Sequence, residues 1–433
     1  MLLTAQLALA APTAAPACTL TPTNSPYLLN NPGNPSCGSP NNSYPDSGSV
    51  VAATWYAAWH SSEFTLQDVS WSKYSSVIYA FATTTPDANV IGLQDSDKQL
   101  LPQFVQTAHA NNVHAILSVG GWTGSQFFSS AVATEANRTA FAQAIMKVVS
   151  QYNLDGIEFD WEYPNNQGVG CNTISTDDST NFLSFLQTLR NQSDANKLIL
   201  SAAVAVRPFI GSDGTPMTDV SEFAKVLDYI EVMNYDVWGS WSASVGPNAP
   251  LDDSCASSPE GSAKSAVKAW TSAGFPAKKI ILGVASYGHS FHVASSNAVD
   301  ATGNIQLYAP FDKSQQPAGD KWDDTAGGVD VCGNPNVVGG IFDFWGLIDG
   351  GFLKQDGTAA SGIKYTFDNC SQTPFVYNPT SQVMVSYDDS TSFAAKGKYI
   401  NEAKLAGFAI WEAGGDSDDI LLDAISEGVG IGC

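Results

Sequence analysis

Apolar residues in this chain fall into short runs that alternate with stretches in which apolar residues recur three and four positions apart. Short apolar runs bounded by turn residues are typical of buried strands, and three/four spacing is typical of amphipathic helices. Because most of the runs are followed by a helical stretch, the pattern predicts an α/β chain with a parallel sheet, closed into a (β/α)8 TIM barrel rather than left open and doubly wound. Eight runs carry this prediction: 51–59, 76–82, 114–121, 154–162, 198–206, 229–236, 280–288 and 407–412.

The spacing of the runs also predicts the domain organisation. The seventh and eighth strands are too far apart for one loop, so we expect residues 290–392 to form a small α+β insertion between the seventh strand and its helix. Residues 18–48 are rich in Pro, Asn and Ser and predict an extended segment. Residues 1–17 combine an apolar run with small residues typical of signal-peptidase sites, which predicts a leader and secretion to the extracellular space. The barrel domain is then expected over 49–433.

The charge balance limits the classes of molecule that this chain is expected to bind. The chain has 42 acidic and 19 basic residues and a formal net charge of −23. Nucleic acids and anionic membrane surfaces attract Lys/Arg patches, so neither is expected to bind this chain. No later segment offers the roughly 20 uninterrupted apolar residues that a membrane-spanning helix needs.

Cysteines and glycosylation acceptors fit a secreted chain. The seven cysteines include no CxxC pair, which argues against a zinc site. In an oxidising compartment they predict up to three disulfides, and Cys18–Cys37 and Cys332–Cys370 are the first pairs to consider. N-glycosylation acceptor motifs begin at Asn41, Asn137, Asn191 and Asn369.

The fourth run, 154–162, carries the most unusual chemistry. Alternate residues of a barrel strand point inward, so Glu158, Asp160 and Glu162 share one face, stacked roughly 6–7 Å apart. Like charges in a poorly solvated barrel should raise at least one pKa, as a general acid at the barrel mouth requires. A solvated charged run or a divalent-cation site would also use these carboxylates. Residues on one strand cannot surround an ion, however, so no metal is expected.

Aromatic residues gather near the predicted C-terminal ends of other strands. A single aromatic residue there is more simply explained as barrel core. A ring of them around carboxylates favours a carbohydrate site, because sugar faces stack on aromatic rings while hydroxyl groups take hydrogen bonds. The residues at these ends are Trp55, Tyr56, Trp59, Trp122, Met233, Tyr235, Asp236, Tyr287 and Trp411.

Three motifs in order carry a resemblance to a known family. DGIEFDWE (155–162) resembles the DGxDxDxE signature of glycoside hydrolase family 18, the chitinases, and Ser118-Val-Gly-Gly and Met233-Asn-Tyr-Asp resemble its SxGG and MxYD motifs. Trp411 resembles the tryptophan of its eighth strand. The resemblance implies a secreted, fungal-type chitinase that hydrolyses β-1,4-linked N-acetylglucosamine with retention. It implies chitin and chitooligosaccharides as partners, no cofactor, and a monomer.

The resemblance also implies roles for individual residues. Glu162 would protonate the glycosidic oxygen, and the substrate's own acetamido oxygen would attack carbon 1 to give an oxazolinium intermediate. Asp160 would orient the acetamide and share a proton with Glu158, and Tyr235 would donate to the acetamide carbonyl. The remaining substrate-binding residues would be Tyr56, Gly121, Trp122, Met233, Asp236, Tyr287, Trp238 and Trp411.

Two departures from the family pattern keep alternatives open. Glu158 stands where the pattern has Asp, which puts the proton sharing with Asp160 in doubt, and His289 stands where the seventh strand usually has Arg. A chitin-binding lectin on the same barrel is one alternative, although such proteins typically lose the acid. An endo-β-N-acetylglucosaminidase acting on glycoprotein glycans is the other.

Overall fold

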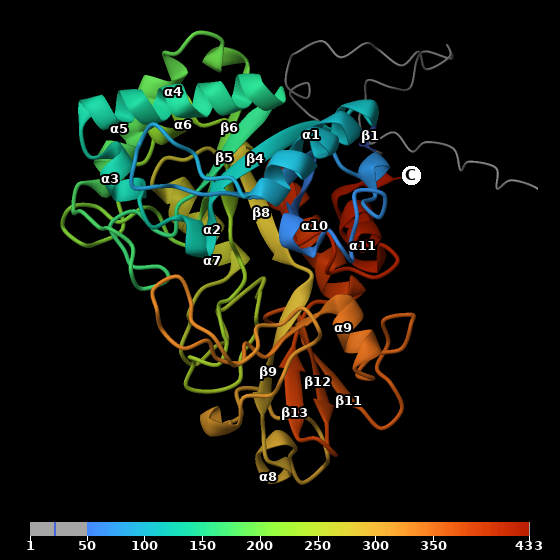
Figure 1. The fold of residues 1–433 in the computed structure, drawn as a ribbon. Helices are drawn as coiled ribbons and strands as arrows, with labels where there is room; N and C mark the ends of the chain where they lie inside the picture. Colours follow the sequence, from blue (N-terminus) through green and yellow to red (C-terminus); the bar gives the residue numbers. More distant parts are fainter. Residues whose placement is uncertain (1–20, 23–49, 433) are drawn as a thin grey trace, which may run out of the picture.

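A closed barrel of eight parallel strands forms the centre of the computed structural model, which describes residues 21–22 and 50–432 (Figure 1). The predicted barrel is confirmed. The run at 229–236 is a strand only as far as Val232, and the run at 280–288 divides between two sheets. In spatial order the strands are β14 (Gly407–Trp411), β2 (Val51–Ala57), β3 (Ser76–Ala82), β4 (His114–Gly120), β5 (Gly156–Asp160), β6 (Ile199–Val204), β7 (Tyr229–Val232) and β8 (Ile280–Ala285), which pairs with β14.

Helices surround the barrel, as the three/four spacing predicts (Figure 1). Local capping sets their ends: α4 begins where the Thr134 side chain accepts a hydrogen bond from the Asn137 N–H, and ends at the left-handed Asn153. No helix in the described residues is long and apolar enough to span a bilayer. The helices are α1 (Asp95–Ala110), α2 (Gly121–Gly124), α3 (Phe128–Val132), α4 (Glu135–Tyr152), α5 (Asp178–Arg190), α6 (Phe223–Val226), α7 (Ala263–Ser272), α10 (Ser390–Ala403) and α11 (Ile420–Val429).

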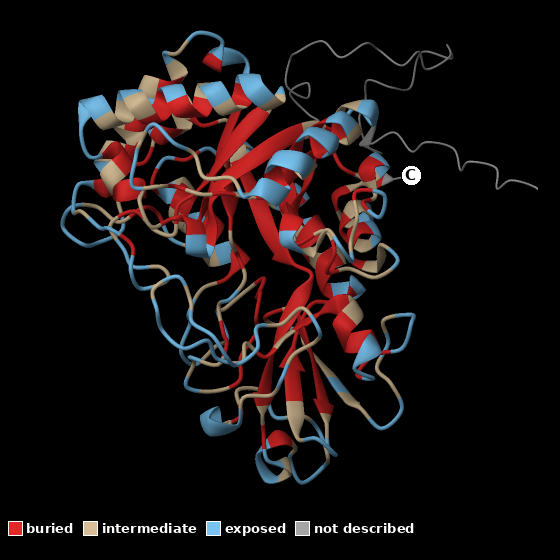
Figure 2. Cartoon of the chain, viewed as in Figure 1, coloured by how far each residue is buried: buried red, intermediate tan, exposed pale blue. Residues whose placement is uncertain are grey.

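The barrel strands are buried on both faces, which is why they read as apolar runs (Figure 2). Alternation along each strand separates an inner core from the layer between strands and helices. The inner core includes Val51, Ala53, Trp55, Ile78, Ile116, Ile199, Ile281 and Ala409. The outer layer includes Tyr56, Val77, Leu117, Ile157, Leu200 and Leu282.

The chain between β8 and α10 forms a second, antiparallel sheet beside the barrel mouth (Figure 1). It begins with β9 at Tyr287, directly after β8, so the insertion starts slightly before the predicted residue 290. The spatial order is β10 (Ile341–Asp343), β9 (Tyr287–His292), β13 (Val383–Ser386), β12 (Thr373–Asn378) and β11 (Lys364–Asp368), with the short helices α8 (Ser295–Ala298) and α9 (Phe344–Asp349).

Two disulfides tie this insertion to the barrel loops. Cys171, in the loop after β5, pairs with Cys332, and Cys255, in the loop after β7, pairs with Cys370. The predicted Cys332–Cys370 bond is therefore wrong: each of these cysteines reaches across to the barrel instead of to the other. The predicted leader, the segment 18–48 apart from residues 21–22, and the Cys18–Cys37 pair lie outside the described residues. Thr21–Pro22 (β1) pairs with Ile431–Gly432 (β15).

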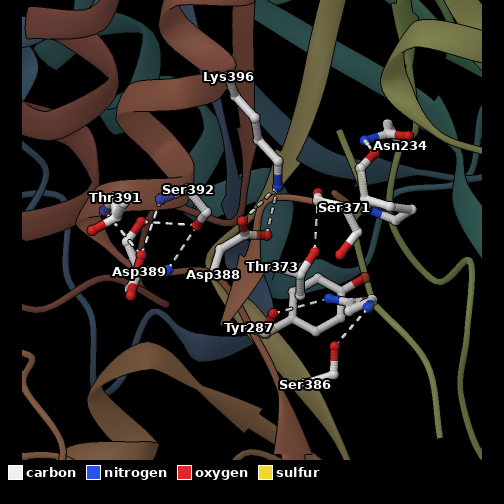
Figure 3. A network of polar contacts seen from close by, with 12 residues as sticks. Asn234, Tyr287, Ser371, Thr373, Ser386, Asp388, Asp389, Thr391, Ser392 and Lys396 are labelled. Atoms are coloured by element: carbon white, nitrogen blue, oxygen red, sulfur yellow. Dashed lines mark hydrogen bonds and ion pairs between the residues drawn. The ribbon is translucent and has the colours of Figure 1, made fainter. Parts of the chain in front are cut away.

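A buried ion pair joins the end of the insertion to the barrel helix that follows (Figure 3). Lys396 of α10 donates to both carboxylate oxygens of Asp388 at 2.6 Å, and both side chains are almost fully buried. The neighbouring Asp389 caps α10 by accepting from the N–H groups of Thr391 and Ser392. This junction sets where β13 stands relative to the barrel.

Candidate active site

Strand β5 places its acidic residues as the alternation predicts. Glu158 and Asp160 point into the barrel and are buried, while Glu162 follows the end of the strand and lines a cavity at the mouth. Trp161 points the other way, stacked 5.1 Å from Phe128 between the ring centroids. Along the inward face of β5, the acidic side chains therefore pass from the buried barrel interior to the open cavity at its mouth.

Hydrogen bonds hold the backbone at Glu162 from two sides. The Ser125 hydroxyl donates to the Asp160 carbonyl at 2.8 Å and accepts from the Glu162 N–H at 3.1 Å. The Asn172 amide donates to the Glu162 carbonyl at 2.7 Å. The position of the carboxyl group is thus set by the loops after β4 and β5 together.

The glycine pair after β4 allows this close fit. Gly120 pairs with Asp160 at a φ of 120°, and a Cβ there would lie 2.0 Å from the Asp160 carbonyl oxygen. Gly121 has a φ of 79°, and a Cβ there would lie 2.8 Å from the Phe81 ring. Gly121 does not line the cavity, so its contribution is to let Phe81 approach.

Burial raises the pKa of all three carboxyl groups on this strand. The pKa of Glu158 rises to about 8, through burial first and then through the charge of Glu231. Burial, followed by Glu158, raises the pKa of Asp160 well above its usual range, and burial, followed by Asp160, does the same for Glu162. A carboxyl group that keeps its proton at the mouth of a cavity has the property of a general acid.

Glu231 is a buried acid that the sequence reasoning missed. It points into the barrel from β7, and burial raises its pKa to about 7. The signal was present, because Glu231, Met233 and Tyr235 are spaced by two in the predicted sixth strand.

Polar groups of the barrel interior surround these buried acids without conventional hydrogen bonds. Ser118 and Trp55 lie close enough to Glu158 to oppose the rise of its pKa, and Ser201 has the same effect on Glu231. Within the described residues, no hydrogen bond of ordinary length and angle is formed by the following atoms: Trp55 Nε1, Ser118 Oγ, both Glu158 carboxylate oxygens, Asp160 Oδ1, Ser201 Oγ and Glu231 Oε2. Such a layer favours carboxyl groups that hold protons over ionised ones.

The segment after β7 brings Met233, Tyr235 and Asp236 to the cavity. Asp236 accepts hydrogen bonds at Oδ1 from the Tyr287 hydroxyl and lies 2.7 Å from His289 Nε2. Tyr287 does not itself line the cavity. Its hydroxyl group holds Asp236 from outside the lining, whereas the sequence led us to expect a direct contact with substrate. His289 holds the same carboxylate oxygen of Asp236 through its Nε2 atom.

Aromatic side chains form one wall of the cavity. Trp59, Phe81 and Trp411 lie in sequence, with stacked rings 5.9 Å apart for the first two and 5.6 Å apart for the last two. Trp59 and Trp122 remain about half exposed, at 55% and 51%. Exposed tryptophan faces beside carboxylates can take the apolar face of a sugar.

Two predicted substrate-binding residues lie elsewhere. Tyr56 points away from the barrel interior, packs near Phe104 and donates to the Phe64 carbonyl at 3.0 Å. Its neighbour Trp55 takes the inward position, so strand alternation corrects the expectation for Tyr56. Trp238 is also buried and packs against Tyr308 and Gly246 outside the cavity lining.

The cavity has a volume of about 750 Å³, within the usual range for small-molecule sites. Arg207 is the single cation among the described residues that line it, whereas six lining residues are acidic: Asp97, Asp160, Glu162, Asp236, Glu260 and Asp324. This balance disfavours anionic ligands and suits a neutral one. Arg207, Asp324 and Glu260 come from irregular loops, where the sequence offered no pattern to find them.

Comparisons with known proteins agree with this geometry. The family model described as glycosyl hydrolases family 18 matches residues 51–416. A chitinase-like effector of Moniliophthora roreri is 51% identical over 389 residues, covering 89% of this chain and 94% of the relative. A chitinase-like effector of Moniliophthora perniciosa is 48% identical, covering 88% and 87%. The crystal structure of a chitinase from Rhizomucor miehei superposes with a TM-score of 0.78 at 32% identity, covering 87% of this chain and 99% of that one.

Proposed function

The chain belongs to glycosyl hydrolase family 18, and on that premise we propose that it is a secreted chitinase, which hydrolyses β-1,4-linked N-acetylglucosamine chains. The observation that carries the proposal is Glu162. Its carboxyl group lines the cavity, its backbone is held from two sides, and burial raises its pKa. The two disulfides between insertion and barrel support secretion, because such bonds persist in oxidising compartments.

In the proposed reaction the substrate supplies its own nucleophile. Glu162 gives its proton to the glycosidic oxygen as the bond from carbon 1 to that oxygen breaks. The acetamido carbonyl oxygen of the same sugar bonds to carbon 1 and forms an oxazolinium ion. The Glu162 carboxylate then takes a proton from the water that attacks carbon 1, so the product keeps its configuration and the acid is restored.

Neighbouring residues have assigned parts in this proposal. Asp160 orients the acetamide N–H and balances the positive charge that develops on the ring, and Tyr235 donates to the acetamide carbonyl. Asp236, oriented by Tyr287, binds the sugar on the other side of the cleavage point. Trp411, at the end of the aromatic wall, carries the sugar that is cleaved. The preference of the buried acids for their protonated forms supports a proton shared by Asp160 and Glu158.

A second candidate is binding of chitooligosaccharides without hydrolysis. The observation in its favour is the name of the two Moniliophthora relatives, which calls them chitinase-like effectors. Release of glycans from a glycoprotein would indicate a third activity, that of an endo-β-N-acetylglucosaminidase.

Replacing Glu162 by Gln tests the proposal. We expect the purified chain to cleave chitin oligomers and the Glu162→Gln variant to be slower by about 10²-fold or more, because the amide cannot donate the proton. Oligomer binding should persist, since shape and stacking are unchanged. Products are followed by mass spectrometry and binding by calorimetry, with Glu402→Gln on the exposed face of α10 as the matched control. Binding without cleavage by the unmodified chain would favour the second candidate.

A further inference from the structure

One connection of the insertion reaches back across the barrel mouth. Residues 324–339, between β9 and β10, are called the arm here. They form a hairpin in which the Gly339 N–H donates to the Asp324 carbonyl at 3.2 Å and Val329 bridges Pro335. At its tip, Asp330 Oδ1 accepts from the N–H groups of Cys332 and Asn334, each at 2.8 Å. The arm is thus an ordered hairpin.

The root of the arm stands on the barrel rim beside β2. The Trp322 ring stacks on His60, with 4.0 Å between the ring centroids and 10° between the planes. Lys321 pairs with Glu63 at 2.5 Å. His60 and Glu63 both follow β2 directly, so these contacts fix the root at that strand's end.

The tip of the arm is fixed at β5. Cys332 is bonded to Cys171 in the loop after β5, and the next residue of that loop, Asn172, donates to the Glu162 carbonyl. Figure 1 shows the connection leaving the insertion and crossing to this loop. The disulfide therefore lies one residue from Asn172, which holds the backbone of the proposed acid Glu162.

The arm follows a chord across the barrel mouth. Around the barrel, β3 and β4 lie on one side between β2 and β5, and β6, β7, β8 and β14 lie on the other. The cavity is lined by Trp122, after β4, on the first side and by Arg207 and Tyr235, after β6 and β7, on the second. Asp324, at the root of the arm, lines it too. The line from the root to the tip of the arm therefore passes between the two sides of the cavity, and of the arm's own residues Asp324 is the one that lines it.

The disulfide is the bond that keeps the arm in place. Glycine pairs flank the hairpin, Gly327-Gly328 near one root and Gly339-Gly340 at the other, and Gly328 and Gly340 have φ values of 77° and 76°. Glycine adopts such φ values at no steric cost, and the Gly340 N–H is held by Asp323 Oδ2 at 2.8 Å. Without a bond at the tip, the arm would be held by its own few hydrogen bonds and, at its root, by the contacts with His60 and Glu63.

We propose that the arm and the Cys171–Cys332 bond close a ring over the substrate cavity, so that the site accepts a single polysaccharide chain only through a free chain end. This inference rests on the proposed function and narrows its substrate class. A chain cannot enter a covalently closed ring sideways, so chains packed in a crystal or blocked at both ends are excluded. Soluble oligomers and loose chain ends are accepted.

Binding of end-blocked oligomers tests this inference, with Glu162→Gln present in every form to prevent cleavage. The probes are a chitin octamer, the octamer with a bulky group at one end, and the octamer with bulky groups at both ends. Calorimetry compares the form that keeps both disulfides with Cys171→Ser/Cys332→Ser. The matched control is Cys255→Ser/Cys370→Ser, which removes the other bond between insertion and barrel.

With both disulfides, we expect the free and singly blocked octamers to bind alike. The doubly blocked octamer should bind at least about tenfold more weakly, a difference of about 1.4 kcal/mol or more. Removing Cys171–Cys332 should restore binding of the doubly blocked octamer, and the control should not. Equal binding of singly and doubly blocked octamers with the tether intact would overturn the inference, as would continued exclusion after its removal.

Hydrogen exchange separates this inference from the proposed function. Amides of residues 330–334 should exchange faster without the Cys171–Cys332 bond and at the original rate in the control. Unchanged exchange without the bond would overturn the role of the tether whether or not sugars bind. In a further outcome, the free octamer binds to none of the forms while hydrogen exchange changes as expected. That result would overturn the proposed function and the entry of substrate through a chain end. It would still support the role of the Cys171–Cys332 bond in holding the arm.

Discussion

At the scale of single residues, the barrel interior holds two acids where it offers few hydrogen bonds. Glu158 and Glu231 are buried, and the charge of Glu231 is one cause of the raised pKa of Glu158. Burying two ionised carboxylates side by side costs more free energy than keeping a proton on them. The proposed acid Glu162 thus stands above a layer of carboxyl groups that hold protons, and the charge of Glu231 helps to keep Glu158 protonated.

Replacing Glu231 by Gln should change how stability depends on pH. The pKa of Glu231 is raised to about 7 in the folded chain, so between about pH 4.5 and pH 7 the unfolded chain loses this proton while the folded chain keeps it. The free energy of unfolding therefore falls as pH rises through this window. In Glu231→Gln the fall should be smaller by on the order of 3 kcal/mol.

Urea unfolding at both ends of the pH window measures this effect. Glu402→Gln, on the surface of α10, should keep the pH dependence of the unmodified chain. An identical pH dependence in Glu231→Gln would show that the buried layer does not hold its proton on Glu231.

At the scale of elements, the junction between β13 and α10 decides how the insertion meets the barrel. Asp388 and Lys396 form an ion pair with almost no solvent contact, and Asp389 caps the same helix (Figure 3). A buried pair gains little net stability over apolar residues, but leaving one partner alone is costly. The pair therefore specifies where the helix and strand meet.

Replacing Lys396 by Met should destabilise the chain by about 3–5 kcal/mol, because Asp388 is left buried without its partner. Adding Asp388→Leu to that variant should recover part of the loss, since no charge then remains in the apolar site. Urea unfolding of both variants measures the difference. A double variant less stable than Lys396→Met would mean that other contacts of Asp388 matter more than the ion pair.

At the scale of the whole molecule, the insertion and the barrel are joined at separate places around the mouth. Cys171–Cys332 joins the loop after β5 to the arm, and Cys255–Cys370 joins the loop after β7 to the turn between β11 and β12. The cavity is lined by barrel residues and loops and, from the arm, by Asp324. The shape of the site is therefore a property of both parts together.

Removing the second of these bonds should lower stability without opening the arm. Cys255 and Cys370 are 115 residues apart, and cross-linking distant residues restricts the unfolded chain. We expect Cys255→Ser/Cys370→Ser to lose about 2–4 kcal/mol of unfolding free energy in urea under oxidising conditions. An unchanged unfolding midpoint would mean that this bond does not constrain the unfolded state.

The barrel, the strand that carries Glu158, Asp160 and Glu162, and the family could all be predicted from the amino-acid sequence. These follow from local periodicity, because a strand's side chains alternate with a period of two wherever the strand lies. The same two-residue alternation places the Tyr56 side chain on the outer face of the barrel and the Glu231 side chain on the inner face.

The disulfide partners, the contact between Tyr287 and Asp236 and the path of the arm emerged from the folded chain alone. Each of these depends on segments that are distant in the chain and joined through irregular loops. Loop conformation follows from what the loop packs against, and no periodic signal encodes it. The acidic residues of the proposed site could therefore be predicted from one strand, whereas the entry of substrate to the site depends on how the insertion folds back over the barrel.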